Sequence, residues 1–463
     1  MMSYSIVPVD KDVFRAYDIR GIVGDNFNEN TFYTIGKAIA YRLKQLERQE
    51  IFVARDGRLT SDSLAAALAA GLVDSGIKVV DIGSVATPVM YYATFEHGID
   101  SGLMVTGSHN PAEYNGIKMI LASKTLVQAD IDLLYDIIQA GNYLTGKGTY
   151  ETVNVLDDYT NRVIRDIRLA RPLKVVVDCG NGIAGAVIPE VIESLGCEVI
   201  PLYCEVDGRF PNHHPDPTVE ANLADLKAAV AAHQADIGLG FDGDADRLGV
   251  VTNEGKVIWP DRLMMYYAQD VLKRNPGATI VYDVKCSSHL ATVITNAGGV
   301  ASMCPTGHSI VKAVMKTSQA VLAGEMSGHL FFKDGWYGFD DALYSACRLL
   351  EIASKNDLSI DDQFAMIPDS INTPEIKITI DEAMKFNFMK RFGDEAEFIN
   401  ATIIRIDGLR VEFANGWGLV RASNTTPCLV ARFEAHDEKH LSDIKSLFKA
   451  QLLKVDHTLL IPF

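Results

Sequence analysis

A unit of strand, polar loop, helix, glycine and strand occurs three times in the first two thirds of the chain. The units begin with strands at residues 51–54, 173–177 and 279–282, and these strands lead into the polar loops RDGR, DCGNG and DVKCSS. The predicted helices follow at 63–75, 186–195 and 289–296, and the second strands at 78–82, at 198–202 and from 300. Because βαβ units recur in any large α/β protein, the repeat indicates the class of fold only. It predicts three similar α/β domains with mixed sheets, whose ligand sites lie at the carboxyl ends of the strands.

The C-terminal part of the chain has a different pattern. Strand-like runs precede a helix at 438–453, without an evident βαβ unit; the runs lie at 375–380, 402–406, 409–413, 419–421 and 428–434. This pattern predicts a smaller α+β domain with an antiparallel sheet. At 463 residues the chain is long enough for several domains, and we expect these at 1–153, 154–256, 257–369 and 370–463.

Three aspartates, Asp242, Asp244 and Asp246, lie within the stretch FDGDADR at 241–247. The apolar runs on either side, 237–241 and 248–252, read as short buried strands, which places the acids on the turn between them. Three carboxylates that close repel one another unless a cation neutralises them, and oxygen ligands favour Mg²⁺ or Ca²⁺ over zinc or copper. The turn is therefore a candidate magnesium site.

Three other kinds of loop share this acidic pattern. An ordinary solvated acidic loop stays open. An EF-hand loop counted from Asp242 fails, because its sixth position would be Arg247 instead of glycine and its twelfth Asn253 instead of glutamate. A nucleophilic Asp242, as in haloacid dehalogenases, also stays open and would make the protein an aspartyl-phosphate phosphatase or mutase.

A second motif, TGSHNPAEYNGIK, occupies residues 106–118 after the apolar segment 102–105. Ser108 lies between a glycine and the sequence HNP, a loop composition that exposes its hydroxyl as a candidate nucleophile or phosphate carrier. A serine needs a base or a metal beside it, and His109 and Lys118 are the local candidates. A simple turn without chemistry is the alternative.

Together with GEMSGH at 324–329 and RASNTTP at 421–427, these motifs resemble those of the alpha-D-phosphohexomutase superfamily in content and order. Within it, GEMSGH is similar to the loop of bacterial phosphomannomutase/phosphoglucomutase enzymes, whereas phosphoglucosamine mutases typically have GEQSGH. Met326 thus carries much of the choice between these subgroups, and phosphoglucosamine mutase is kept as an alternative.

The resemblance implies four domains around a central cleft and a reversible exchange of phosphate between the 1 and 6 hydroxyls of mannose or glucose. Ser108 would carry the phosphoryl group, Mg²⁺ would be the cofactor, and glucose 1,6-bisphosphate would serve as intermediate or activator. Phosphorylated hexoses would be the substrates, in carbohydrate metabolism that supplies nucleotide-sugar precursors.

The resemblance also implies a role for each residue that matches a family motif. The metal ligands would be Asp242, Asp244, Asp246 and the phosphoryl oxygen on Ser108. The catalytic set would be Ser108, His109, Lys118, Arg247, His329 and Arg20. The substrate-binding set would be Tyr17, Lys285, His308, Glu325, Ser327, His329, Arg421, Ser423, Asn424 and Thr425. By residue type, Glu325 suits sugar hydroxyls and Arg421 suits a phosphate.

Composition excludes several other classes of function. The net charge of −17 disfavours nucleic acid and anionic membranes as partners, and any phosphate site must depend on a local cluster of cationic side chains. The sequence has no run of eighteen apolar residues and no apolar segment near its start, so we expect no membrane span, no secretory signal and a cytoplasmic location. We also expect a monomer. Seven scattered cysteines without a CxxC pair predict reduced thiols and no zinc site.

Overall fold

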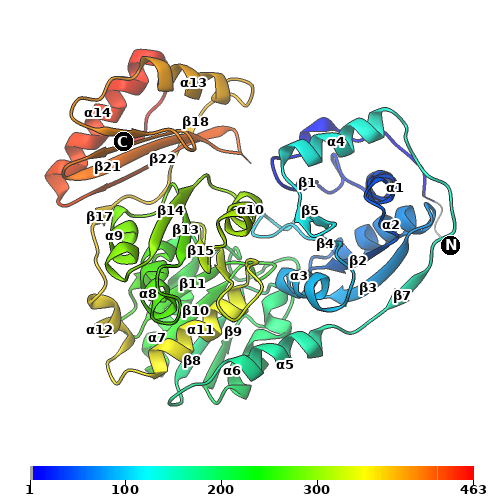
Figure 1. Ribbon diagram of the computed structural model, residues 1–463, viewed down its shortest axis with the longest axis horizontal. Helices are drawn as coiled ribbons and strands as arrows, with labels where there is room; N and C mark the ends of the chain where they lie inside the picture. The colour runs from blue at the N-terminus through cyan, green and yellow to red at the C-terminus, as the bar shows by residue number, and fades with distance from the viewer. Residues whose placement is uncertain (1–3, 425) are drawn as a thin grey trace.

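The computed structural model describes residues 4–424 and 426–463 and divides them among four sheets (Figure 1). The first three sheets combine parallel and antiparallel strands, and every pair in the fourth is antiparallel. Three similar α/β domains followed by a C-terminal α+β domain were predicted, and this fold class is confirmed. In the described part of the chain, no helix has the length and apolar character needed to cross a bilayer.

The first sheet has the order β1-β5-β4-β2-β3-β7, with β6 beside β5. Strand β2 runs parallel to β3 and β4, and β5 runs antiparallel to β4 and β1. The strands are β1 (Ile19–Ile22), β2 (Glu50–Arg55), β3 (Lys78–Ser84), β4 (Gly102–Val105), β5 (Tyr114–Leu121), β6 (Lys124–Thr125) and β7 (Tyr150–Thr152). The helices are η1 (Lys11–Val13), α1 (Glu29–Gln45), α2 (Ser61–Val73), α3 (Thr87–Glu96) and α4 (Gln128–Gln139).

The second and third sheets have the orders β12-β11-β10-β8-β9 and β14-β13-β15-β16. The second contains β8 (Lys174–Asp178), β9 (Glu198–Leu202), β10 (Ile237–Phe241), β11 (Leu248–Thr252) and β12 (Val257–Ile258), with α5 (Leu156–Asp166), η2 (Ile183–Ala186), α6 (Ile188–Ser194), η3 (Glu220–Leu223) and α7 (Ala224–His233). The third contains β13 (Thr279–Asp283), β14 (Val300–Cys304), β15 (Leu322–Gly324) and β16 (Leu330–Phe332), with α8 (Pro260–Arg274), α9 (Ser288–Asn296), α10 (His308–Ser318), α11 (Ala342–Ser354) and α12 (Ile360–Ala365).

The repeat extends further than the sequence indicated. In each of the three units, two parallel strands are followed by a third parallel strand and then by an antiparallel partner that closes a hairpin: β4–β5, β10–β11 and β15–β16. The motif with Ser108, the three aspartates and GEMSGH lie in these three hairpin connections. Three candidate functional loops therefore occupy the same topological position in three related units.

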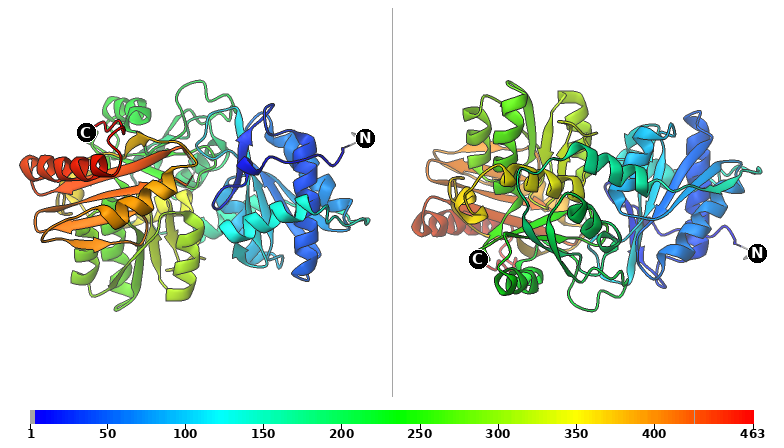
Figure 2. Two further views of the ribbon diagram at one scale, coloured as in Figure 1. Left: turned by 90° about the horizontal axis from the view of Figure 1, so that it is seen from above. Right: turned by 90° about the horizontal axis from the view of Figure 1, so that it is seen from below.

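The fourth sheet has the order β17-β22-β21-β20-β19, with β18 beside β22. Its strands are β17 (Ile371–Asn372), β18 (Ile376–Thr379), β19 (Thr402–Ile404), β20 (Leu409–Phe413), β21 (Gly416–Ala422) and β22 (Cys428–Ala435), and its helices are α13 (Lys385–Glu395) and α14 (Glu438–Val455). Both views in Figure 2 place this sheet and α14 beside the second and third units, at the end of the molecule away from α1.

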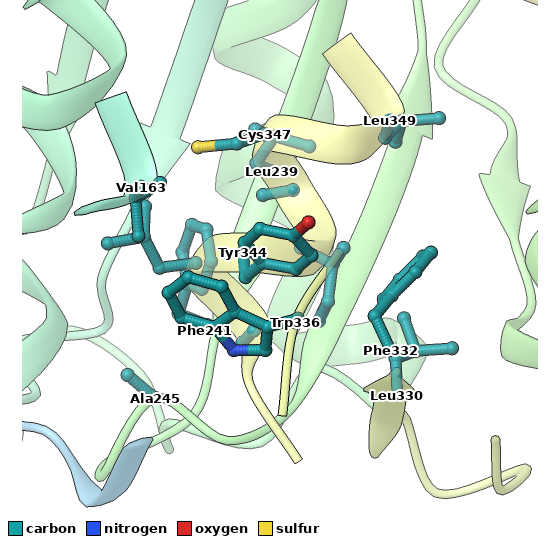
Figure 3. Packing of buried hydrophobic residues seen from close by; sticks show 14 of the residues in the cluster. Val163, Leu239, Phe241, Ala245, Leu330, Phe332, Trp336, Tyr344, Cys347 and Leu349 are labelled. Atoms are coloured by element: carbon teal, nitrogen blue, oxygen red, sulfur yellow. The ribbon is translucent and has the colours of Figure 1, made fainter. Parts of the chain in front are cut away.

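The first three units share one continuous apolar core, and the fourth has its own. Figure 3 shows part of the shared core between the second and third units. Phe241 of β10 lies there with Tyr344 of α11 and with Trp336, which precedes that helix. The rings of Trp336 and Tyr344 stack with centroids 4.2 Å apart. Because this core is shared, the first three hairpin loops are held in fixed relative positions.

The strands β9, β10, β11 and β20 have the predicted bounds, and most other predicted elements end within two residues of theirs. The helix predicted at 186–195 is shorter: a 3-10 turn, η2, precedes α6, which begins at Ile188. Proline at the second position of α6 has no N–H to donate to the preceding turn, so the α-helix begins there.

Candidate active site

The loop with Ser108 and the loop with the three aspartates meet directly. Ser108 Oγ donates to Asp242 Oδ2 over 3.2 Å, although the two residues are 134 positions apart. Ser108 is buried, with a φ of +50° that a non-glycine residue adopts only under local constraint. Gly243 is needed at the junction, because a Cβ there would lie 2.4 Å from Ser108 O.

Arg58 supplies the constraint on the serine loop. Its guanidinium donates to Ser108 O over 2.7 Å and to Asn110 O over 2.6 Å, and it also bonds the carbonyls of Pro111 and Tyr114. Asp56 lies 3.2 Å from Arg58 Nε and accepts from Thr106 Oγ1 over 2.8 Å. A charged pair from the end of β2 thus stabilises the backbone that presents Ser108.

Arg58→Ala is expected to destabilise the protein by about 3–5 kcal/mol, because it leaves the buried Asp56 carboxylate without its counter-charge and the carbonyls of Ser108 and Asn110 without their guanidinium donor. Chemical denaturation monitored by fluorescence measures this change. Arg55→Ala is the matched control from the same strand, where a more exposed ion pair contributes about 1 kcal/mol or less. Equal losses for the two variants would contradict the proposed role of Arg58.

The three aspartates are fully buried, and their candidate ligand oxygens lie within 4.8 Å of one another. Lys118 Nζ lies 2.6 Å from Asp244 Oδ2 and also bonds Asp246. Lys118 was predicted as a neighbour of Ser108. It lies on β5, and its side chain reaches the aspartate turn. Thr87 Oγ1 donates to the same Asp244 oxygen over 2.5 Å.

The pKa values of two of the three carboxyl groups shift in opposite directions. Burial and the neighbouring Asp244 and Asp246 raise the pKa of Asp242 well above its ordinary value. Burial acts in the same direction on Asp244, but the Lys118 ammonium outweighs it and lowers the pKa of that carboxyl. Burial opposes charge on Lys118 as well, yet the aspartates raise its pKa. One ammonium thus neutralises only part of the charge that three ionised acids would carry.

The donor set fits a hard divalent cation. Asp244 Oδ1 and Asp246 Oδ1 are buried and accept no hydrogen bond from the described residues. Asp242 Oδ1 accepts the backbone N–H groups of Asp246 and Arg247 over 3.0 and 3.1 Å, which orients its second oxygen toward Ser108. Ala245, with a φ of +62°, turns the chain between the acids. Carboxylate oxygens without hydrogen-bond donors are suited to Mg²⁺.

The GEMSGH loop pairs with the aspartate loop. Arg247 and His329 form an isolated bridge, and Arg247 Nε donates to His329 Nε2 over 3.2 Å. The other ring nitrogen, Nδ1, lies 3.2 Å from Asp340 Oδ2 and 3.5 Å from Asp246 Oδ1. Nε2 thus presents its lone pair to Arg247, and the two carboxylates favour a proton on Nδ1.

Asp340 was not singled out from the sequence. It is fully buried, bonds Lys312 over 2.8 Å and faces the imidazoles of His308 and His329. The signal was the pair Asp340 and Asp341 before α11: Asp341 caps that helix, which leaves Asp340 free for another role. Cationic neighbours, led by Lys312, outweigh burial and lower the pKa of Asp340 well below its usual range.

Two histidines beside the site are neutral. Burial and the Arg247 charge lower the pKa of His109 well below its usual value, and its Nδ1 lies 3.5 Å from Ser108 Oγ. Burial and the Lys312 charge lower the pKa of His308 in the same way. The His308 ring lies edge-on to Tyr17, with centroids 5.2 Å apart, and stacks on His329 at 5.6 Å.

The remaining predicted sugar contacts lie close by. Glu325 is buried, accepts the N–H of Gly307 over 2.6 Å and has a pKa that burial raises. Ser327 is half-buried on the turn between β15 and β16. Arg20 reaches across to the serine loop, where it donates to Asn110 Oδ1, and also bonds Asp18 over 2.5 Å.

The predicted phosphate contacts lie where the third and fourth sheets meet. Lys285 Nζ pairs with Glu375 over 2.6 Å, and Arg421 Nε pairs with Asp407 over 2.8 Å. Asp407 Oδ2 also accepts the N–H of Thr306, beside His308, over 3.1 Å. Both acids were missed from the sequence, because a single glutamate or aspartate in a polar loop has no distinctive pattern.

The RASNTTP loop is only partly described. Ser423 and Asn424 follow β21 on the connection to β22, and Ser423 Oγ lies 2.8 Å from Thr426 Oγ1. Thr425, predicted as a phosphate contact, lies outside the described residues. Cationic side chains from all four units thus face the site: Arg20, Lys118, Arg247, Lys285 and Arg421. This supplies the local positive charge that the acidic composition requires.

Comparisons with known proteins agree along the whole chain. Models of the four phosphoglucomutase/phosphomannomutase domains match it: the alpha/beta/alpha domains I, II and III at 11–144, 157–255 and 259–370, and the C-terminal domain at 375–451. A phosphomannomutase/phosphoglucomutase of Pseudomonas putida is 52% identical, with 97% of each chain covered, and a phosphoglucomutase of Neisseria meningitidis is 47% identical, with 96% and 97% covered. A crystal structure of a phosphoglucomutase/phosphomannomutase family protein from Burkholderia thailandensis superposes with a TM-score of 0.94 at 44% identity, covering 98% of this chain and all of that one.

Proposed function

The chain belongs to the phosphoglucomutase/phosphomannomutase family, and from that premise we infer that it reversibly interconverts the 1-phosphate and 6-phosphate of mannose, glucose or both. The comparisons support this activity and not the alternatives of a phosphoglucosamine mutase or an aspartyl-phosphate enzyme. One observation carries the mechanism we propose: Ser108 Oγ lies 3.2 Å from a carboxylate of the buried aspartate turn.

Ser108 is the proposed phosphate carrier, with Mg²⁺ held by Asp242, Asp244 and Asp246. When bound, the ion would neutralise charge on the transferring phosphoryl group. Lys118, from the neighbouring β5, balances the charge that the ion leaves on Asp244 and Asp246. Arg20 bonds Asn110 of the serine loop, Arg247 bonds His329 beside the aspartate turn, and we assign both guanidinium groups to phosphoryl oxygens.

In the proposed transfer, the bond from phosphorus to Ser108 Oγ breaks as a bond from phosphorus to the free sugar hydroxyl forms. His329 Nε2 accepts the hydroxyl proton, and the departing Ser108 oxygen gains a proton in the net reaction. In this structure Nε2 accepts from Arg247, so it becomes available when Arg247 donates to phosphate instead. Asp340 beside Nδ1 stabilises the imidazolium that forms.

The product of this step is a hexose 1,6-bisphosphate, glucose 1,6-bisphosphate for the glucose substrate, which also serves as an activator. The second half returns the other phosphate to Ser108, which requires the sugar to reverse its orientation. Glu325 and Ser327 would bind ring hydroxyls, with Tyr17 and His308 beside them. Lys285, Arg421, Ser423, Asn424 and Thr425 would bind the phosphate that does not react.

Steady-state rates with three hexose 1-phosphates test the substrate class. We expect turnover of mannose 1-phosphate and glucose 1-phosphate within about tenfold of each other, because one site must accept the sugar in both orientations, and roughly tenfold or slower turnover of glucosamine 1-phosphate. A preference for glucosamine 1-phosphate would instead support the phosphoglucosamine mutase alternative.

The chemistry of the phosphorylated enzyme separates serine from aspartate. A protein labelled with phosphate from glucose 1,6-bisphosphate should retain the label in acid and in hydroxylamine, since a phosphoserine ester resists both. Release by hydroxylamine would point to an acyl phosphate on Asp242.

The wider assignments are proposals of the same kind. We propose that the enzyme acts as a cytoplasmic monomer in the supply of nucleotide-sugar precursors, without nucleic acid or membrane partners. The serine, metal, sugar and phosphate loops are assigned to domains 1–153, 154–256, 257–369 and 370–463. Sedimentation velocity at micromolar concentration tests the monomer.

A further inference from the structure

Two cysteine sulfurs are in contact beside the aspartate loop. Cys204 Sγ lies 3.4 Å from Cys179 Sγ, the one contact between two cysteine sulfurs in residues 4–424 and 426–463 that satisfies hydrogen-bond geometry. Both cysteines follow parallel strands of the second sheet, Cys179 after β8 and Cys204 after β9. Both sulfurs are free thiols.

We propose that Cys179 and Cys204 form a peroxide-sensitive dithiol, whose oxidation to a disulfide distorts the aspartate loop and lowers the activity of the enzyme. A disulfide requires a sulfur separation of about 2.05 Å, so the two side chains must approach further by a distance that rotation at Cβ and a small backbone shift can supply. The two segments run side by side just past the strand ends, where Cys179 N donates to Leu202 O over 3.1 Å.

The two thiols have different environments. Cys179 is fully buried, whereas Cys204 is only partly buried and is the one that solvent reaches. The hydrogen bond with Cys179 lowers the pKa of Cys204. Burial raises the pKa of Cys179 well above its ordinary value. Cys204 is therefore the thiol that peroxide attacks first, and Cys179 is the resolving thiol.

The oxidation has two steps, with hydrogen peroxide as the oxidant. The Cys204 thiolate attacks one peroxide oxygen, so that an S–O bond forms, the O–O bond breaks and one water leaves after protonation. The Cys179 sulfur then attacks the Cys204 sulfur, which forms the S–S bond and releases a second water. Two thiols are oxidised and one peroxide is reduced, and a dithiol reductant reverses the change.

The segment between the two sulfurs and the aspartate loop transmits the change. Residues 179–186 pack closely against Cys204 and against the aspartate loop, with no room for a side chain at two glycines. A Cβ at Gly185 would lie 1.9 Å from Cys204 O, and a Cβ at Gly182 would lie 3.0 Å from Gly243 Cα. Ile183 N donates to Gly243 O over 3.1 Å. Because Gly243 separates Asp242 from Asp244, a shift of this segment moves two proposed metal ligands.

Peroxide treatment followed by alkylation and peptide mass spectrometry tests the proposal directly. We expect a Cys179–Cys204 linked peptide, and a fall in the rate with glucose 1-phosphate of roughly tenfold or more that follows its yield and reverses with dithiothreitol. The linkage is read independently of the activity, so a failure of the proposed mutase function would not remove this part of the test.

Cys204→Ser should retain its rate under the same treatment. If Cys204→Ser does not fold, Cys179→Ser replaces it as the test variant. Cys197→Ser is the matched control from the start of β9, and it should lose activity as the unmodified enzyme does. Two results would overturn the proposal: no linked peptide at peroxide levels that oxidise other cysteines, or equal inactivation of Cys204→Ser and the unmodified enzyme.

Discussion

Ser108→Ala is expected to lower the mutase rate roughly 10³-fold or more while the enzyme still binds its phosphosugar. The variant removes the oxygen that is proposed to carry the phosphoryl group. The backbone of the loop should persist, because Arg58 binds the carbonyls around Ser108 and Asp242 retains its bonds from two backbone N–H groups. Turnover of glucose 1-phosphate and calorimetric binding of glucose 6-phosphate measure the two quantities separately.

Ser75→Ala is the matched control for this prediction. Ser75 is also a buried serine of the first unit, but its hydroxyl donates to Gly71 O at the end of α2, away from the aspartate turn. Its rate should equal that of the unmodified enzyme. A Ser108→Ala enzyme with more than half of the normal rate, or one that still accepts a phosphate label, would rule out the phosphoserine mechanism.

The local parts of this site were predictable because each depends on a short stretch of sequence. The aspartate turn follows from two apolar runs around FDGDADR, and the observed strands β10 and β11 have the bounds that those runs predicted. The serine loop follows from glycine, asparagine and proline around Ser108. Hydrophobic periodicity and turn residues determine such segments without reference to the rest of the chain.

The contacts between loops were not predictable from the same signals. The ion pairs of Lys118 with Asp244 and Asp246 join residues 126 and 128 positions apart, and no local pattern of the sequence indicated them. Glu375 gains its role from Lys285, which lies 90 residues earlier in a different unit. Pairings over such separations depend on tertiary packing, of which one sequence contains no direct record.

The shared topology of the three units explains why the loops converge. The serine, metal and sugar loops each join the third strand of a unit to its antiparallel partner, and a common apolar core fixes the units relative to one another. The sequence repeat reached only the first two parallel strands of each unit. Its extension to the hairpin is what turns three separate motifs into one site.

Asp242→Asn is expected to abolish magnesium binding and to lower the rate roughly 10²-fold or more. The amide oxygen can still accept the N–H groups of Asp246 and Arg247, and the NH₂ group then takes the place of the oxygen that faces Ser108. The substitution thus removes a negative ligand and preserves volume and hydrogen bonds. Binding of the metal ion gives this variant a second readout that is independent of catalysis.

Thermal unfolding with and without MgCl₂ provides that readout. An ion that binds only the folded protein stabilises it by about 2.7 kcal/mol at a hundredfold excess over its dissociation constant. The unmodified enzyme should therefore melt at a higher temperature with magnesium, and Asp242→Asn should not. Asp236→Asn, just before the other end of β10, is the control: its carboxylate accepts the N–H of Lys174 over 2.7 Å, so its magnesium shift should match that of the unmodified enzyme. An undiminished shift in Asp242→Asn would mean that the ion binds elsewhere, and the buried oxygens of Asp244 and Asp246 would then need another source of positive charge.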